Sequence, residues 1–582
     1  MTTLKADNTS NNNVSILGMP SENDWILNGL AFDTSLIRDY LSYNLSRQIG
    51  NYATRTVYCE LVINGDYRGL YVMQEKIKSN TNRVNVTKIA STDNSEPNLS
   101  GGYITKADKE TGGDPIAWTM NSYLWSTNFI HELPKPSAVT SNQNTYIYNQ
   151  FLNLESTSGA NNTSVINGFP SMIDVSSFVD FMLINEIASN ADAYQYSTYF
   201  HKDRGGKLRA GPVWDFNLTY GNDLFLWGFD RSHPDIWQFA NGDNEGSKFW
   251  RDLFNNPTYK CYLAKRWSQL IQPGQPLNYN SMVQYIDQTV AYISEAKVRE
   301  EQKWTTDDYP AVHFPSTEID NLKNWLSNRI SWMTNNLGSF TNCNTVSIPS
   351  LVINKINYNP LGGSPTESDN LEFVEIKNTS VYNVNLTGLY FKELGLSYQF
   401  PVNSSVSGGG SIYLASNAPA FQAKYGISAF GQFNRNLSNN SQKIVLVDGF
   451  GNTIDSVEYF DASPWPIEAD GTGSYLQLIN TSLDNNLAPN WISSSNNMLS
   501  TNSTLESSVL SIYPNPVTHF LSIHASKQMS GIKIFDISGK LIFDFKQKSD
   551  TIKTDWSIYP NGIYFILIYD EFSFVTKKII KE

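Results

Sequence analysis

Hydrophobic residues recur at helical spacing in several stretches before about residue 340. In each stretch apolar side chains return every three or four positions, which predicts a helix with one buried face. The predicted helices are 33–50, 174–189, 281–300 and 320–337. The helix 174–189 is apolar nearly all round, so we expect it to be buried. Asp174 is placed to cap its N-terminus.

A second pattern, alternation of apolar and polar residues between turn signals, predicts strands in the same region. The predicted strands are 55–64, 69–78 and 101–108, followed by a hairpin over 198–213. Residues 137–163 are polar with few signals, and no element is assigned there.

Beyond residue 340 the alternating runs become short and are separated by Gly, Asn and Ser clusters. This pattern is typical of β-sandwiches. It predicts one sandwich at 348–480, a polar linker at 481–506 and a small C-terminal sandwich at 507–582. A chain of 582 residues is too long for one core. The predicted fold class is therefore multidomain: an α+β domain, then a β-sandwich and a second, small β-sandwich.

Composition narrows the function. The net charge of −13 disfavours a nucleic-acid partner, which needs a basic face to neutralise phosphates. Three cysteines (Cys59, Cys261 and Cys343) show no metal-ligand spacing and imply no disulfide framework. No apolar run reaches the roughly 18 residues of a transmembrane segment. The first twenty residues are polar and contain no signal-peptide core, so either the protein is cytosolic or the chain begins downstream of the true N-terminus.

The candidate chemistry lies in residues 185–223, at the end of the predicted buried helix. Asp192 is on the loop after this helix, and Asp215 follows the hairpin. Phosphoryl transfer uses such a pair, one Asp for the attacking hydroxyl and one for Mg²⁺. Protein kinases place an amide residue five positions after the first Asp, and an Asp-Phe-Gly motif after a hairpin. Here Ser197 replaces the amide and Asn217 replaces the glycine, with Gln195 or Asn217 placed to compensate for the weaker serine ligand.

Ordinary structural roles explain the same residues, because this spacing is common by chance. Asp192 and Asp223 are then loop caps, and Asp203 is a turn residue of the hairpin. Trp214 and Phe216 are then simply part of the core.

Four ordered segments carry a family resemblance. They are LGMPSENDWILNGLAFDTSLIRDYLSYNLSRQIG, NGDYRGLYVMQEKIKSNTNRVNV, GGYITKADK and SNADAYQYSTYFHKDRGGKLRAGPVWDFNLTYGN. Together they resemble the CotH family of spore-coat-protein-H-like atypical kinases over residues 14–338. The resemblance implies a divergent kinase-like fold that uses ATP and Mg²⁺ to phosphorylate secreted or coat proteins. It assigns Asp192 as the catalytic residue, Asn190 as the residue that shapes its loop, and Asp215 with Asn217 as the metal site.

The nucleotide pocket is less defined. Glu75, in GLYVMQEKIK, is a candidate for its lining, as are Lys106 and Ser197. The alternatives are an exposed strand end at Glu75 and an ordinary surface lysine at Lys106. Relatives usually carry R-G-x-S-S and a Lys-Lys pair upstream of the L-G-M-P segment, which this chain lacks. We therefore expect an N-terminally shortened chain that has lost its signal peptide and part of its ATP cradle.

Two further resemblances follow. LVINKINYNP, LEFVEIKNTS and SPWPIEADGTGSYLQL resemble the lamin-tail domain. The resemblance implies an immunoglobulin-like β-sandwich, usually an adhesion or spacer module. Its carboxylates Glu372, Glu375 and Asp470 suggest either a Ca²⁺ site or, as we prefer, turn and edge positions. SIYPNPVTHFLSIHAS, IKIFDISGKLI and the terminal TKKIIKE resemble the C-terminal sorting domain of the type IX (Por) secretion system of Bacteroidetes. This implies outer-membrane secretion machinery as a partner and a secreted or cell-surface location.

Two hypotheses remain. The first is a secreted or cell-surface kinase that transfers phosphate from Mg-ATP to Ser/Thr of extracellular proteins. The alternative is a catalytically inactive adhesion or binding protein on a kinase-like fold. Ser197, Asn217 and the missing upstream lysines favour the second, and the Asp192/Asp215 pair favours the first.

Overall fold

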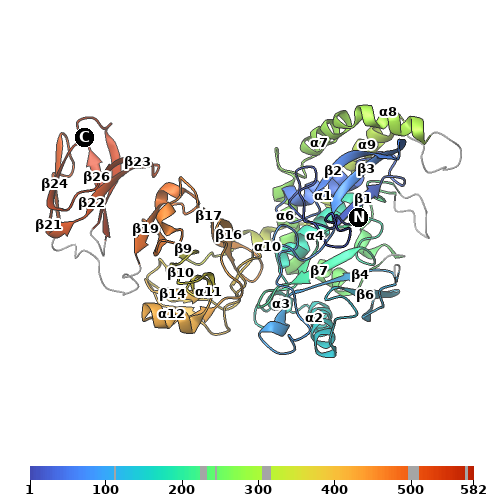
Figure 1. The fold of residues 1–582 in the computed structure, drawn as a ribbon, viewed down its shortest axis with the longest axis horizontal. Coiled ribbons are helices and arrows are strands. Elements are labelled where there is room, and N and C mark those ends of the chain that lie inside the picture. Colours follow the sequence, from blue (N-terminus) through green and yellow to red (C-terminus); the bar gives the residue numbers. More distant parts are fainter. Residues whose placement is uncertain (111–112, 223–231, 243–244, 305–315, 496–509, 570–573) are drawn as a thin grey trace. The chain divides into compact units, whose positions relative to one another are not determined.

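The computed structural model describes the whole chain except residues 111–112, 223–231, 243–244, 305–315, 496–509 and 570–573 (Figure 1). The described residues form two compact units. The first contains Met1–Ser347 and Gly449–Asn452, and the second contains Ile348–Asp448 and Thr453–Glu582. The multidomain fold class is confirmed: an α/β N-terminal region, then a β-rich sandwich region and a C-terminal β-sheet domain.

Two antiparallel sheets organise the first unit. The smaller has the order β1-β3-β2 and the larger the order β5-β6-β4-β7-β8. Their strands are β1 (Trp25–Gly29), β2 (Thr56–Ile63), β3 (Asp66–Glu75), β4 (Tyr103–Ala107), β5 (Trp118–Asn121), β6 (Ser126–Leu133), β7 (Thr198–Lys202) and β8 (Arg209–Ala210). The predicted strands 55–64, 69–78 and 101–108 and the hairpin 198–213 are thereby confirmed.

The helices of the first unit confirm the four predicted ones. They are α1 (Arg38–Gln48), α2 (Ser141–Gly159), α3 (Phe169–Met172), α4 (Val175–Ala188), α5 (Phe249–Asn255), α6 (Pro257–Leu270), α7 (Tyr279–Tyr292), α8 (Ser294–Lys303), α9 (Glu318–Asn336) and α10 (Thr341–Asn344). The predicted helix 281–300 is divided into α7 and α8, and α8 packs beside β3 (Figure 1). None of the helices in the described residues is long and apolar enough to span a bilayer.

Helix α2 occupies the segment that sequence pattern left unassigned. Thr140 and Gln143 form a capping box at its start, since each side chain bonds the backbone of the other residue. Only Ile147, Phe151 and Leu154 supply a buried apolar stripe. Packing and capping therefore stabilise this helix, and its polar composition explains why the hydrophobic pattern did not predict it.

Helix α4 is the central element of the first unit. Every side chain on it except Ser176 is buried, and it contacts α1, α6, α9 and β8. Asp174 caps it as predicted, by accepting a hydrogen bond from Ser177 N at 3.1 Å. At its other end Ser189 adopts a left-handed conformation with φ 47°. This residue ends the helix and turns the chain into the loop that carries Asp192.

The second unit begins with a sandwich of a six-stranded sheet (β15-β14-β10-β9-β18-β19) and a three-stranded sheet (β12-β16-β17), with the pair β11-β13. The strands are β9 (Leu351–Asn357), β10 (Phe373–Asn378), β11 (Val384–Asn385), β12 (Tyr390–Phe391), β13 (Ser405–Val406), β14 (Ser411–Ala415), β15 (Gly431–Gln432), β16 (Ser441–Val447), β17 (Thr453–Phe460), β18 (Ser474–Leu478) and β19 (Trp491–Ser495). Two short helices accompany them, α11 (Pro365–Asp369) and α12 (Ala418–Tyr425).

The predicted linker 481–506 is wrong in its first part. Trp491 pairs with Leu478 in the β18–β19 ladder and is buried in the sandwich core. The polar residues around Trp491 hid this edge strand. Residues 496–506 of the predicted linker lie outside the described residues.

The three carboxylates considered for a Ca²⁺ site in this sandwich make separate contacts. Glu372 accepts from Leu437 N at 2.7 Å, Glu375 lies 2.8 Å from Lys355 Nζ, and Asp470 accepts from Asn359 Nδ2 at 2.7 Å. Glu375 lies in β10, an interior strand, so the prediction of an edge position is wrong for it.

The C-terminal domain has two sheets, β20-β21-β24 and β23-β22-β25-β26. The strands are β20 (Leu510–Tyr513), β21 (Phe520–Met529), β22 (Gly531–Asp536), β23 (Leu541–Phe545), β24 (Ser549–Asp555), β25 (Gly562–Tyr569) and β26 (Phe574–Lys581). Trp556 is fully buried among the aliphatic residues of both sheets.

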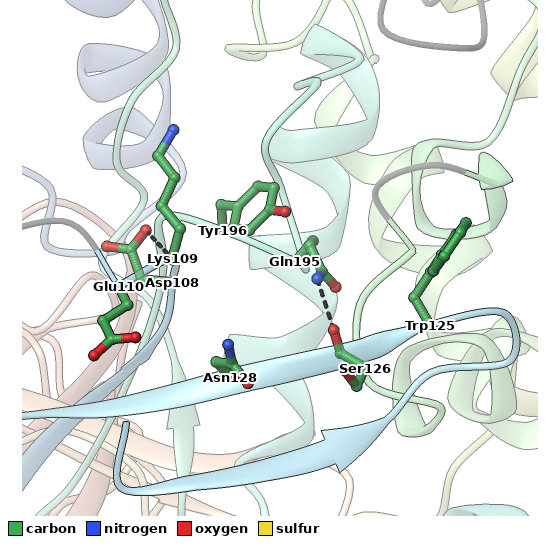
Figure 2. A pocket seen from close by; sticks show the side chains of 8 residues that line it. All are labelled: Asp108, Lys109, Glu110, Trp125, Ser126, Asn128, Gln195 and Tyr196. Atoms are coloured by element: carbon green, nitrogen blue, oxygen red, sulfur yellow. Dashed lines mark hydrogen bonds between the residues drawn. The ribbon is translucent and has the colours of Figure 1, made fainter. Parts of the chain in front are cut away.

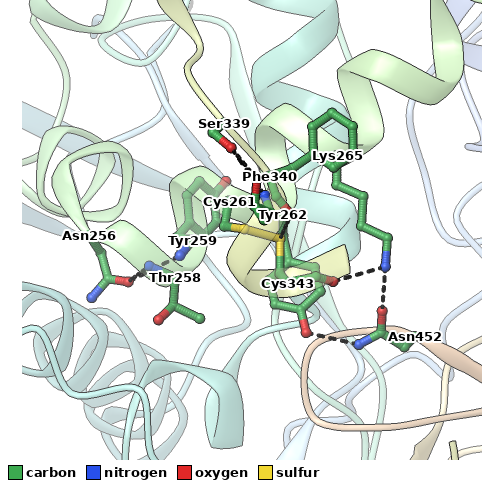
Figure 3. Close-up of a disulfide and its surroundings, with 11 residues drawn as sticks. Asn256, Thr258, Tyr259, Cys261, Tyr262, Lys265, Ser339, Phe340, Cys343 and Asn452 are labelled. Carbon is green, nitrogen blue, oxygen red and sulfur yellow. Dashed lines mark hydrogen bonds between the residues drawn. A yellow bond between two sulfur atoms is a disulfide. The ribbon is translucent and has the colours of Figure 1, made fainter. Parts of the chain in front are cut away.

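A disulfide joins Cys261 on α6 to Cys343 on α10 (Figure 3). The cysteine count implied no disulfide framework, and for this pair that expectation is wrong. The two residues are 82 positions apart, so only the tertiary fold brings them together. Cys59 is free and half-buried.

Replacing Cys261 and Cys343 together by Ser is expected to lower the free energy of unfolding by about 2–5 kcal/mol, because the disulfide restricts the unfolded chain over a long loop. Urea unfolding of the full chain under oxidising conditions measures the loss. The control is Cys59→Ser, which removes a thiol without opening a loop and should change stability far less. An equal loss in both variants would contradict the prediction.

Candidate active site

Strained backbone gathers in residues 189–220. Among the described residues, twelve non-glycine residues have positive φ, and five of them lie in this stretch. They are Ser189 (47°), Tyr194 (71°), Ser197 (48°), Asp215 (64°) and Tyr220 (50°). Such conformations cost about 1–3 kcal/mol each and persist where the surrounding structure enforces them, which is typical of functional sites.

The loop after α4 holds Asp192 in place through its backbone. Asn190 Oδ1 accepts from Asp192 N at 3.2 Å, and Asn190 Nδ2 donates to Asn185 Oδ1 at 3.1 Å. Tyr196 N donates to the carbonyl of Asp192 at 2.9 Å. Asn190 thus makes the contacts of a loop-shaping residue, while its part in catalysis stays a prediction.

Asp215 follows β8, and both its backbone and its side chain make hydrogen bonds. Asp215 N donates to Tyr43 Oη at 3.1 Å, and Ser197 Oγ donates to Asp215 Oδ2 at 3.2 Å. Burial, followed by the charge of Asp192, raises the pKa of the Asp215 carboxyl to about 6, while the bond from Ser197 opposes the shift. Ser197 directly follows Tyr196, whose N donates to the carbonyl of Asp192 at 2.9 Å. The fold therefore brings Asp192, Ser197 and Asp215 together.

Asp39 on α1 is a third carboxylate of this neighbourhood, and the sequence patterns missed it. Its Oδ1 accepts from Phe216 N at 2.7 Å, and its Oδ2 accepts from Asn28 Nδ2 of β1 at 3.0 Å. It therefore fixes the backbone next to Asp215. The available signal was the i, i+4 spacing of Asp39 and Tyr43 on one helix face, since both contact residues 215–216.

Asp39→Asn is expected to change how stability depends on pH. Burial and the charge of Asp215 raise the pKa of Asp39 from its ordinary 3.8 to about 7. Between these pH values the folded state retains a proton that the unfolded state has lost, so this carboxyl costs stability as the pH rises. We therefore expect the free energy of unfolding of the variant, relative to that of the wild type, to rise by about 2 kcal/mol from pH 5 to pH 8.

Metal-free urea unfolding at several pH values measures this difference. Asp287→Asn, on the surface of α7, controls for the loss of a carboxylate. If the wild type and Asp39→Asn show parallel pH profiles, Asp39 is not the group responsible.

The candidate nucleotide residues lie on different sheets. Glu75 ends β3 and is fully buried, so the alternative of an exposed strand end is wrong for it. Its carboxylate accepts from Arg55 Nη1 at 2.8 Å and from Tyr52 Oη at 3.2 Å. Lys106 lies on β4 opposite Tyr199, and its Nζ is 2.9 Å from Asp108 Oδ2. Lys106 thus belongs to the larger sheet, whose strand β7 begins directly after Ser197, whereas Glu75 belongs to the smaller sheet.

Other candidates have structural roles. Asp203 accepts from Arg204 N at 2.9 Å and Thr87 N at 3.0 Å, which confirms it as a turn residue. Phe216 is fully buried in the core, as the structural interpretation predicted, and Trp214 is half-buried. Asp223 lies outside the described residues.

The two residues placed to support the metal differ in their surroundings. Gln195 accepts from Thr127 Oγ1 at 2.9 Å and donates to Ser126 O at 2.8 Å, so its amide is already engaged. Asn217 is partly exposed, and its carbonyl accepts from Asn222 Nδ2 at 2.8 Å.

A buried ion pair between α4 and α9 supports the loop that carries Asp192. Arg329 Nη2 of α9 lies 3.0 Å from Glu186 Oε2 of α4, and both side chains are almost completely buried. Glu186 Oε1 also accepts from Tyr194 Oη at 2.8 Å. Because Tyr194 is two residues after Asp192, this network connects α4 and α9 to the candidate catalytic loop.

The donor set suits a hard cation shared with phosphate groups. Within the described ranges, His, Cys, Asp and Glu form no group of three or more that would hold a metal by protein ligands alone. Mg²⁺ is commonly held by one or two carboxylates together with substrate phosphates. Asp215, with Asp192 nearby, meets that requirement, and a divalent cation would relieve their mutual repulsion.

The fold and this site define a multidomain protein whose first unit carries a paired-carboxylate site. Comparison with known families assigns it: residues 3–333 match the CotH kinase protein family, and the chain belongs to that family. Residues 344–461 match the lamin tail domain, and residues 511–582 match the secretion system C-terminal sorting domain. These matches confirm the three resemblances in their order. No curated protein matches the chain.

The sorting domain indicates secretion to the cell surface and an interaction with the type IX secretion machinery. The protein is therefore a secreted CotH-like protein.

Proposed function

We propose that the protein is a kinase that transfers phosphate from Mg-ATP to Ser or Thr hydroxyls of extracellular or cell-surface proteins. The observation that carries this proposal is the coupling of Asp192 and Asp215. Their carboxylates influence each other in a stretch of strained backbone, and the two residues follow one another along the chain in the order found in protein kinases.

The residues divide the chemistry as follows. Asp192 accepts the proton of the acceptor hydroxyl, whose oxygen bonds to the γ-phosphorus of the substrate ATP as ADP leaves. Asp215 holds Mg²⁺, with Ser197 and Asn217 beside it. Lys106 is the candidate cation for the phosphates, because it pairs with Tyr199 of β7, the strand that begins directly after Ser197. Asn190 keeps the Asp192 loop in shape.

Location supports the choice of substrate. A protein exported by the sorting domain encounters secreted and surface proteins. The Cys261–Cys343 disulfide suits an oxidising compartment.

Incubation of the full chain with γ-labelled ATP, Mg²⁺ and dephosphorylated casein tests the proposal. We expect transfer of label to protein serine or threonine, and its loss when the metal is chelated, because Asp215 then has no cation to place against the phosphates. Label that persists in the chelator would contradict the assigned role of Asp215. No label under any metal condition would favour the alternative, a non-catalytic surface binding protein.

A further inference from the structure

A pocket opens beside the turn that carries Asp192. It is a cavity of about 440 Å³ lined by residues 108–110 after β4, by Trp125, Ser126 and Asn128 at the start of β6, and by residues 195–196 (Figure 2). Tyr196 N bonds the carbonyl of Asp192, so the pocket wall and Asp192 belong to one turn. Tyr196 also precedes Ser197, whose Oγ donates to Asp215 Oδ2 at 3.2 Å. The pocket therefore borders the turn that carries Asp192 and contacts Asp215.

The lining offers little to hold a nucleotide triphosphate. Lys109 is the one lysine among the described residues of the lining and lies 5.6 Å from the centre of the Tyr196 ring, while Asp108 pairs with Lys106 Nζ at 2.9 Å. A triphosphate is usually held by several cations and backbone N–H groups, which these lining residues do not supply. Amides contribute instead: Asn128 accepts from Thr119 through Oδ1, and its amide nitrogen points into the pocket (Figure 2). Such groups suit a polypeptide backbone.

The opposite end of the pocket is aromatic. Trp125 is 62 % exposed, yet its Nε1 donates to Gly242 O at 3.0 Å, so its ring is held in place (Figure 2). Tyr123 and Leu124, beside it in the β5–β6 turn, are also exposed. Arg251 lies 4.9 Å from the centre of the Tyr123 ring and steadies it. Fixed, exposed aromatic rings are typical anchors for a polypeptide partner.

We propose that this pocket receives the acceptor segment of the protein substrate. An extended polypeptide lies between the acidic end at 108–110 and Trp125, with an apolar side chain against Trp125 and its Ser or Thr hydroxyl towards Asp192. The proposal rests on the proposed function for the reaction, but the binding of the segment is measurable without catalysis.

The test uses the full chain and an array of Ser-containing peptides in which one flanking position at a time is aromatic, aliphatic or Gly. Binding is measured without ATP for the wild type, for Trp125→Ala and for Tyr292→Ala, an exposed aromatic control on α7. We expect Trp125→Ala to weaken binding of the preferred peptides by about 10-fold or more. Tyr292→Ala should bind them as the wild type does, and binding of a non-hydrolysable ATP analogue should be equal in all three proteins.

Three results would overturn the pocket assignment. They are wild-type protein that retains no peptide, Trp125→Ala that retains peptides unchanged, and loss of the ATP analogue in Trp125→Ala. Failure of the kinase function gives a different result. Peptide binding would then depend on Trp125 while no phosphate is transferred, and the pocket assignment would stand alone.

Discussion

Asp192→Asn is expected to lower the rate of phosphoryl transfer by about 10²–10⁴-fold, the usual contribution of a positioned general base. The amide has nearly the same shape, so the backbone bonds that Asp192 makes with Asn190 and Tyr196 should persist. The loss should appear in kcat, with little change in the KM for ATP, because Asp192 acts on the acceptor hydroxyl. Initial rates with labelled ATP measure both constants, and Asp287→Asn is the control for a lost surface carboxylate.

The same variant has an effect that does not require catalysis. The charge of Asp192 is the strongest charge raising the pKa of Asp215. Its removal should therefore lower that pKa, so that protons compete less with Mg²⁺ and the acid limb of Mg²⁺ binding moves to lower pH. Calorimetric titration with Mg²⁺ between pH 4 and pH 8 measures the shift. An unchanged acid limb would mean that the two carboxylates do not share one site.

The hydrophobic pattern was sufficient for the elements that carry the candidate site. Periodicity and turn signals predict helix α4 and the hairpin β7–β8, because these are local properties of the chain. They also place Asp192 on the loop before the hairpin and Asp215 after it. The pairing of Glu75 with Arg55 does not follow from them. A strand pattern indicates which residues alternate, and it does not identify the partner of a buried charge.

Contacts between distant residues account for what the pattern missed. Asp39 and Phe216 are 177 positions apart, and Cys261 and Cys343 are 82 apart. Asp39 also lies in a helix with an ordinary amphipathic pattern, where a carboxylate usually faces water. Its burial becomes visible only when α1 packs against the chain after β8.

The second large effect is expected at Arg329, which no motif identified. Arg329→Met should lower the free energy of unfolding by about 3–5 kcal/mol, because it leaves the buried carboxylate of Glu186 without its counter-charge. Arg329 Nε also donates to Glu186 O at 2.7 Å, and its Nη1 donates to Pro234 O at 2.8 Å. Burial raises the pKa of Glu186 and lowers that of Arg329 to about 10, so desolvation acts against both charges.

Urea unfolding of the full chain measures the loss, and Lys323→Met on the same helix is the matched control. Lys323 pairs with the exposed Asp287, and such surface pairs contribute about 1 kcal/mol or less. The double variant Glu186→Gln/Arg329→Met should recover part of the stability, since no unpaired buried charge remains. Because Tyr194 donates to Glu186, Arg329→Met should also loosen the Asp192 loop and lower kcat in protein that is still folded. If Arg329→Met costs no more than Lys323→Met, the buried pair does not support this loop.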